Sequence, residues 1–216
     1  VERVLEYTKE KQENKDGLVV ENWPRESGIR FKDVYLSYKT DQDHILKNLN
    51  FTIKNKQKVA IVGRTGSGKT SLISTLVRLY DFKGNIFIDN VDIKTLPVDF
   101  LRSKISVIPQ EPTIFSGTIR ENIDPTRQYS DDDIWKVIRT VNLSMFHDLN
   151  EKIDMGLSVG QKQLICLCRA LVRRNKIVIF DEINASADLE TEALIQKIVL
   201  ENFAEYTVIA IIHKLH

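Results

Sequence analysis

Cysteine is scarce in this chain, and its two residues form neither a metal-binding nor a disulfide pattern. Cys166 and Cys168 lie two positions apart in an apolar stretch with helical spacing, so their side chains point in different directions. No second pair at metal-ligand spacing follows them. We therefore expect buried, reduced thiols, as in a cytosolic protein, rather than a zinc site or a disulfide scaffold.

An excess of charge of either sign is missing as well. The 31 lysines and arginines nearly balance the 30 aspartates and glutamates, so no bulk field attracts nucleic acid or an anionic membrane. No apolar run approaches the roughly 20 residues that span a bilayer, and the N-terminus lacks a signal-peptide pattern. What the chain does have is 216 residues of which 42% are hydrophobic, enough for one sizeable α/β core.

The order of apolar patterns predicts strands and helices that alternate along the chain, as in an α/β domain. Alternation or short apolar runs predict strands at 29–38, 49–53, 59–62, 85–89, 105–108, 177–180 and 207–212. The first two form an antiparallel flank, and 59–62 should be covered on both faces. Helical spacing predicts helices at 1–8, from Lys69 to about Asp81 with Leu79 on its inner side, after Ser130, at 159–173 and at 189–200.

The glycine-rich run at 63–70 is the most informative motif. It follows the apolar run 59–62 and fits the P-loop pattern G-x-x-x-x-G-K-[ST]. Glycines let backbone N–H groups approach phosphate oxygens, and the following helix adds its positive end. Lys69 supplies a charge for the β- and γ-phosphates, and Thr70 a hydroxyl for Mg²⁺. The expected nucleotide-binding residues here are Gly63, Arg64, Thr65, Gly66, Ser67, Gly68, Lys69, Thr70 and Ser71.

Two acids, Asp181 and Glu182, follow the apolar run 177–180. In P-loop proteins a carboxylate at the tip of such a strand helps to hold Mg²⁺, and a second one beside it can deprotonate the attacking water. Alone, the pattern also fits a strand that enters a solvated acidic turn. Together with the P-loop it predicts a hydrolytic nucleotide site.

Between these motifs, Leu157-Ser158-Val159-Gly160-Gln161 stands just before an apolar helix that Ser158 is suited to cap. The sequence LSVGQ, followed after that helix by IVIFDE, resembles the signature and Walker B motifs of ATP-binding-cassette (ABC) ATPases. The resemblance implies that residues 157–161 face the γ-phosphate bound by a partner cassette, through anion binding at a helix N-terminus.

Other positions resemble family motifs one by one. Gln110 resembles the Q-loop glutamine that touches Mg²⁺, and residues 185–188 resemble the D-loop at the dimer interface. Tyr38 resembles the aromatic residue on which adenine stacks, and His213 the switch histidine that contacts the γ-phosphate. Taken singly, Tyr38 and His213 would be a core tyrosine and a strand-end histidine. The resemblance implies catalytic roles for Glu182 and His213, and Mg²⁺ ligation by Thr70, Gln110 and Asp181.

The segments VERVLEYT (1–8), IPQEPTIFSGTIRENIDP (108–125) and LSVGQKQLICLCRAL (157–171) resemble the second nucleotide-binding domain of multidrug-resistance-associated transporters, ABC subfamily C. The resemblance implies the tail of a last transmembrane helix and a linker at 1–26. It implies a C-terminally truncated cassette at 27–216, with a helical subdomain at about 112–172. Such a cassette binds ATP and Mg²⁺ at the cytosolic face of a membrane. Its partners are a second cassette, with which it pairs head to tail, and the transmembrane domains of the same transporter. It binds neither nucleic acid nor the exported substrate.

The chain also departs from the family pattern. First, only Met155 and Gly156 stand between Lys152-Ile153-Asp154 and LSVGQ. Second, after Asp181-Glu182 this chain has Ile183-Asn184 in place of small residues and threonine. Third, the chain ends at His216. A regulatory or inactive partial cassette is therefore an alternative to an ATPase that drives export. A soluble ABC-type ATPase acting on DNA or ribosomes is a further alternative. Such proteins have long coiled coils or a paired cassette where this chain has a short insert.

Overall fold

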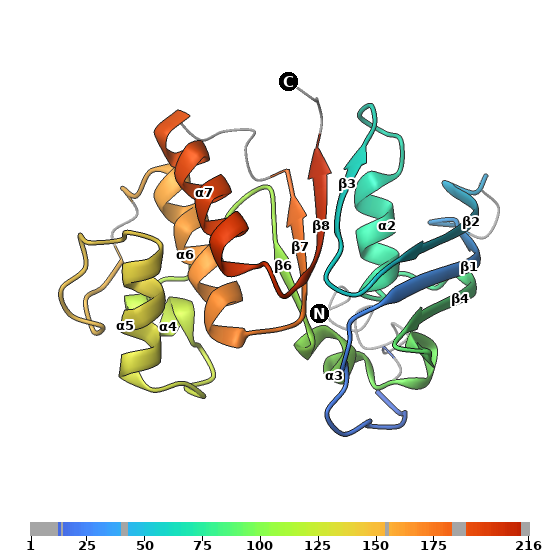
Figure 1. The fold of residues 1–216 in the computed structure, drawn as a ribbon, viewed down its shortest axis with the longest axis horizontal. Helices are drawn as coiled ribbons and strands as arrows, with labels where there is room; N and C mark the ends of the chain where they lie inside the picture. The colour runs from blue at the N-terminus through green and yellow to red at the C-terminus, as the bar shows by residue number, and fades with distance from the viewer. Residues whose placement is uncertain (1–12, 14, 40–42, 154–155, 183–188, 213–216) are drawn as a thin grey trace, which may run out of the picture.

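A computed structural model of the chain describes residues 13, 15–39, 43–153, 156–182 and 189–212. These residues form two four-stranded sheets (Figure 1). One sheet is antiparallel with strand order β2-β1-β4-β5, and the other is parallel with order β3-β8-β7-β6. The α/β class with an antiparallel flank, expected from the sequence, is confirmed.

The elements have the following bounds. The antiparallel sheet contains β1 (Ile29–Leu36), β2 (Leu46–Ile53), β4 (Lys83–Ile88) and β5 (Val91–Asp92). The parallel sheet contains β3 (Lys58–Val62), β6 (Ile105–Ile108), β7 (Ile177–Asp181) and β8 (Thr207–Ile212). The helices are α2 (Lys69–Leu76), η1 (Ile93–Thr95), α3 (Val98–Ser103), α4 (Ile119–Ile123), α5 (Asp131–Thr140), α6 (Val159–Arg173) and α7 (Leu189–Asn202). The helix expected at 1–8 lies outside the described residues.

The parallel sheet separates two hydrophobic cores, because successive side chains of a strand point to opposite faces. Val178 and Phe180 of β7 pack with helices α4 to α7, whereas Ile177 and Ile179 pack with α2 and the antiparallel sheet. In Figure 1, α6 and α7 accordingly cover one face of the sheet and α2 the other. Strand β7 is buried on both faces, as its continuous apolar run predicts.

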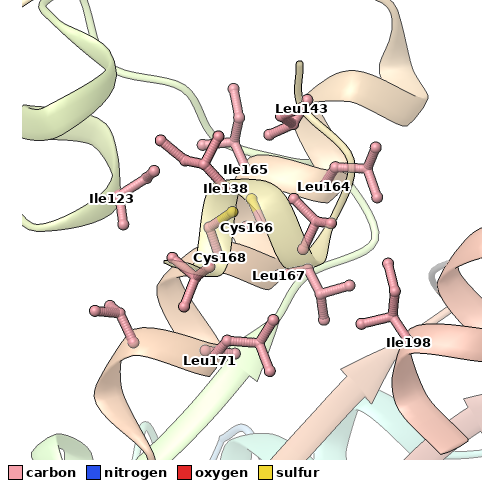
Figure 2. Packing of buried hydrophobic residues seen from close by; sticks show 14 of the residues in the cluster. Ile123, Ile138, Leu143, Leu164, Ile165, Cys166, Leu167, Cys168, Leu171 and Ile198 are labelled. Atoms are coloured by element: carbon pink, nitrogen blue, oxygen red, sulfur yellow. The ribbon is translucent and has the colours of Figure 1, made fainter. Parts of the chain in front are cut away.

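Both cysteines lie within the helical core. Cys166 and Cys168 are free and buried, and Figure 2 shows them among leucine and isoleucine side chains of that cluster. Burial raises the pKa of both thiols. The expectation that both thiols are buried is confirmed.

Two local expectations are wrong. Strand β3 is not covered on both faces: Val59 and Ile61 pack against a core, but Ala60 and Val62 are exposed. Strand β3 is at the edge of the described parallel sheet, and the helical core that covers β6, β7 and β8 on this face includes no residue of β3. Helix α2 ends at Leu76 rather than near Asp81, because Arg78 turns into the left-handed region at φ 52°. Leu79 is consequently exposed rather than directed inward.

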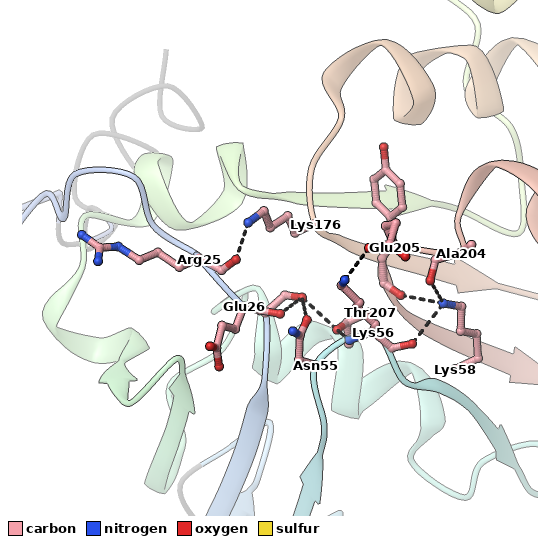
Figure 3. A network of polar contacts seen from close by, with 11 residues as sticks. Arg25, Glu26, Asn55, Lys56, Lys58, Lys176, Ala204, Glu205 and Thr207 are labelled. Carbon is pink, nitrogen blue, oxygen red and sulfur yellow. Dashed lines mark hydrogen bonds and ion pairs between the residues drawn. The ribbon is translucent and has the colours of Figure 1, made fainter.

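Polar contacts tie the N-terminal segment to the amino edge of the parallel sheet, opposite the P-loop (Figure 3). The hydroxyls of Ser27 and Thr207 lie 2.9 Å apart, and the backbone N–H of Lys56 donates to the Thr207 hydroxyl at 2.9 Å. Nearby, the Lys58 ammonium donates to the carbonyl of Tyr206 at 3.1 Å. This network fixes the starts of β1, β3 and β8 relative to one another.

Candidate functional site

The carboxyl ends of the parallel strands collect the predicted site residues at one edge. The P-loop follows β3, Asp181 ends β7 with Glu182 next to it, and Gln110 is two residues beyond β6. Strands of a parallel sheet point the same way, so their carboxyl ends share one edge, where ligands of such sheets bind. His213 would follow β8 but, like the predicted D-loop residues 185–188, lies outside the described residues.

The P-loop has the local geometry that its glycines predict. Gly66 and Gly68 adopt φ angles of 79° and 90°, in the left-handed region that favours glycine. Gly68 is the N-cap of α2, so the loop leads directly into a helix N-terminus. A side chain at Gly63 would place its Cβ 2.6 Å from the hydroxyl of Ser67. The loop is thus a tightly wound, N–H-rich turn of the kind that binds anions.

Lys69 lies folded back into this loop. Its ammonium donates to the carbonyl of Gly63 at 2.8 Å and to that of Arg64 at 3.1 Å, and the side chain is buried. The same ammonium lies 4.0 Å from Oε1 of Glu182, although the two residues are far apart in the sequence. Folding therefore brings together the lysine predicted to bind phosphate and the acid predicted to activate water.

Glu182 is held in an unusual backbone conformation. Its φ of 52° is uncommon for a residue with a side chain, and its N–H donates to the carbonyl of Ile211 at 3.2 Å. The side chain is buried. Such conformations cluster at functional sites. No feature of the sequence around 181–182 signals this turn.

Three oxygen donors were predicted to hold Mg²⁺, and their chemistry fits this ion. Thr70 offers a hydroxyl, Gln110 an amide oxygen and Asp181 a carboxylate, which are hard oxygen ligands. Thr70 and Gln110 are exposed and Asp181 is half-buried. Over the described part of the chain, no group of three or more His, Cys, Asp or Glu residues is placed to hold a metal. An ion bound here would complete its shell with phosphate oxygens and water, as Mg²⁺ commonly does.

The LSVGQ segment forms the start of α6, with a complete capping box. The N–H of Gln161 donates to the Ser158 hydroxyl at 3.1 Å, and the N–H of Ser158 donates to the Gln161 side chain at 2.9 Å. Leu157 and Gly160 are buried, whereas Ser158 and Val159 are exposed. The predicted N-cap is confirmed, and the segment presents an exposed helix N-terminus.

Tyr38 lies beside the first turn of α2. Its hydroxyl is 2.8 Å from that of Ser71, which is buried two residues after Lys69. Its ring is partly exposed and contacts the ring of Tyr80. The structure thus brings Tyr38 to the P-loop helix, whereas Leu157–Gln161 lie on another helix.

Sequence reasoning missed Arg169, which ties the segment after Gln110 to α6. Its guanidinium donates to the carbonyl of Thr113 at 2.6 Å and to the side chain of Asn122 at 3.0 Å, and it lies over the Phe115 ring. Asn122 is fully buried and bonds both backbone groups of Phe115. Burial lowers the pKa of Arg169. The available signal was a charged residue on the apolar side of a helix.

Comparison with known proteins agrees with this geometry. A profile of the ABC transporter family matches residues 46–185. ATP-binding cassette sub-family C member 4 of Mus musculus is 43% identical over 227 residues, covering 100% of this chain and 17% of that protein. ATP-binding cassette sub-family C member 2 of Homo sapiens is 41% identical over 229 residues, covering 100% of this chain and 15% of that protein. ABC transporter C family member 14 of Dictyostelium discoideum is 42% identical over 204 residues, covering 90% of this chain and 16% of that protein.

The chain thus spans only 15–17% of the length of these relatives. The first two alignments are also longer than the 216 residues of this chain, so those relatives have residues for which it has no counterpart. Over its described part, the chain contains no helix long and apolar enough to cross a bilayer.

Proposed function

Because the chain belongs to the ABC transporter family, whose ATP-binding domains are ATP hydrolases, we propose that it is an ATP-hydrolysing cassette that drives export by a subfamily C transporter. We infer further that it is the second of two such cassettes and that it acts at the cytosolic face of a membrane. The observation that carries the hydrolytic part is the Lys69–Glu182 pair: the phosphate-binding ammonium and the buried carboxylate lie 4.0 Å apart beside the P-loop.

ATP binding would use the loop as a backbone cradle. The positive-φ glycines direct N–H groups toward phosphate oxygens, and α2 adds its positive end. The Lys69 ammonium, which now donates to two loop carbonyls, would turn to the β- and γ-phosphates. Thr70, Gln110 and Asp181 would hold Mg²⁺, which supplies positive charge against the charge that develops on the phosphates.

Hydrolysis would use Glu182 as the general base. Its carboxylate accepts a proton from water as the water oxygen attacks the γ-phosphorus, and the bond to the ADP oxygen breaks. The backbone turn and the burial of Glu182 hold the carboxylate beside the P-loop. His213 is proposed to contact the γ-phosphate from the end of β8.

The signature segment would serve the nucleotide of a partner cassette. The P-loop follows β3, whereas α6 packs on β6 and β7, two to three strands away. At a strand spacing of about 4.8 Å, this separation is roughly 10–14 Å within one chain. This lateral offset supports a role for Ser158 at a different triphosphate from the one that Lys69 binds, as in head-to-tail pairing of two cassettes. Transmembrane domains of the same transporter would be the other partners.

Glu182→Gln tests this proposal. The amide cannot take a proton from water, so ATP should still bind, whereas release of phosphate should fall by at least about 100-fold. The measurement is phosphate release by the complete transporter reconstituted with its partner cassette. A matched control is Glu192→Gln, which alters an acid on α7. Unchanged turnover in Glu182→Gln would remove this residue from the role of base.

The second candidate is a cassette that binds ATP and regulates without turnover. The short segment of Met155 and Gly156 before LSVGQ favours it, because a shortened approach would alter how the signature meets the partner's nucleotide. In that case wild type and Glu182→Gln would bind ATP equally and would both fail to release phosphate. Nothing in the described part of the chain favours an ATPase that acts on DNA or ribosomes.

A further inference from the structure

Tyr80 is a partly exposed aromatic residue to which no motif assigns a role. It follows α2, and its ring centroid lies 4.7 Å from that of Tyr38 with 60° between the planes. Tilted aromatic pairs at this distance attract each other. Tyr80 therefore packs directly on the ring proposed to stack on the nucleotide base.

Tyr38 is held at two points. Its hydroxyl is 2.8 Å from the hydroxyl of buried Ser71 in the first turn of α2, and its ring rests against Tyr80 beyond the end of that helix. Tyr38 nevertheless remains 44% exposed, and Tyr80 45%. The ring is thus fixed in place while part of it stays open to a ligand.

The apolar surface continues toward the phosphate site. A Cβ added to Gly68 would lie 3.4 Å from Cγ2 of Ile45, so this partly exposed side chain packs against the last glycine of the P-loop. Ile45 and the Tyr38 hydroxyl therefore lie beside the first turn of α2, and the Tyr38 ring extends from there to Tyr80. With its phosphates at the P-loop, a nucleotide whose base stacks on Tyr38 would have that base beside these side chains.

We propose that Tyr80 is a positioning residue for the nucleotide base. By packing on Tyr38 it restricts rotation of that ring, so less conformational entropy is lost when a base stacks on it. The chemistry recognised is the flat aromatic base of a nucleoside triphosphate. This inference rests on the proposed binding of ATP at the P-loop, and it adds a residue that acts only through Tyr38.

Tyr80→Ala tests the inference by titration of the chain with Mg·ATP and with magnesium tripolyphosphate, which lacks a base. Loss of one aromatic contact should weaken ATP binding about three- to tenfold. Tripolyphosphate binding should change less than about twofold, because the P-loop is intact. A stability defect would weaken both ligands together, and the thermal unfolding midpoint of each variant separates that case.

Three further variants complete the test. Tyr80→Phe keeps the ring and should bind ATP like wild type, and Leu79→Ala alters an exposed neighbour and should have no effect. In a Tyr38→Ala background, adding Tyr80→Ala should cause no further loss of ATP affinity, because the ring that Tyr80 positions is gone. Wild-type ATP affinity in Tyr80→Ala, or additive losses in the double variant, would overturn the inference. Failure of wild type to bind either ligand would instead refute the proposed function.

Discussion

At the scale of single residues, backbone geometry decides what Glu182 can do. Its positive φ, its N–H bond to Ile211 and its burial leave the carboxylate few alternative positions. A base that is already in place needs no reorganisation when water attacks, which is how buried sites gain most of their advantage. The identity of this residue was predicted from its place after an apolar strand. Its conformation was not, because its N–H bonds to the carbonyl of Ile211, a residue far away in the sequence.

The two thiols provide a prediction at the same scale. Burial raises the pKa of Cys166 and Cys168, so both remain neutral thiols in the folded chain at pH values where an unfolded thiol ionises. We expect neither to react with a thiol reagent at pH 8.5 in the time in which both react in denaturant. Since the unfolded thiols ionise first, stability should be full below about pH 8.5 and fall as pH rises further.

Time-resolved labelling of the native and the denatured chain measures this difference. Rapid labelling of both cysteines in the folded state would contradict their burial in the helical core.

At the scale of elements, Gly160 has a packing role that its motif does not reveal. A Cβ at this position would lie 2.7 Å from Cγ2 of Thr191, so the glycine lets α6 and α7 approach closely. We expect Gly160→Ala to destabilise the chain by about 1–3 kcal/mol through overpacking, measured by denaturant unfolding. The cost should shrink in a Thr191→Ala background, which removes the clashing methyl group.

Val159→Ala is the matched control, because it changes an exposed residue in the same turn and should alter stability by less than about 0.5 kcal/mol. Equal costs of Gly160→Ala in both backgrounds would exclude the clash. The pair also matters for function. If Gly160→Ala alone abolishes turnover and the double variant restores it, the loss came from helix packing and not from contact with a partner's nucleotide.

Local sequence predicted some elements well and others poorly. Ser130 and Ser158 cap α5 and α6 as expected, because a capping residue acts on an N–H only three positions away. Leu79 was misplaced because apolar spacing continues past the point at which Arg78 ends the helix. The exposure of Val62 could not be predicted either, since only the strand order puts β3 at an edge. The Arg169–Asn122 contact likewise joins elements distant in sequence.

At the scale of the whole molecule, strand order converts separate motifs into one site. The P-loop, Asp181, Glu182 and Gln110 are far apart in the sequence, but the parallel sheet brings the ends of their strands to one edge. The motifs predicted which residues gather there. The Tyr38–Tyr80 pair and the Lys69–Glu182 contact could not be predicted, because they depend on side-chain positions in the folded chain.

Everything proposed for this chain depends on binding of a nucleoside triphosphate by the loop between β3 and α2. Calorimetric titration of the folded chain with Mg·ATP, alongside Lys69→Ala, measures this binding. We expect saturable binding by wild type and at least about 100-fold weaker binding by Lys69→Ala, because the variant lacks the ammonium that we assign to the β- and γ-phosphates. Absence of saturable heat with wild type, or equal affinity in the variant, would contradict the P-loop assignment.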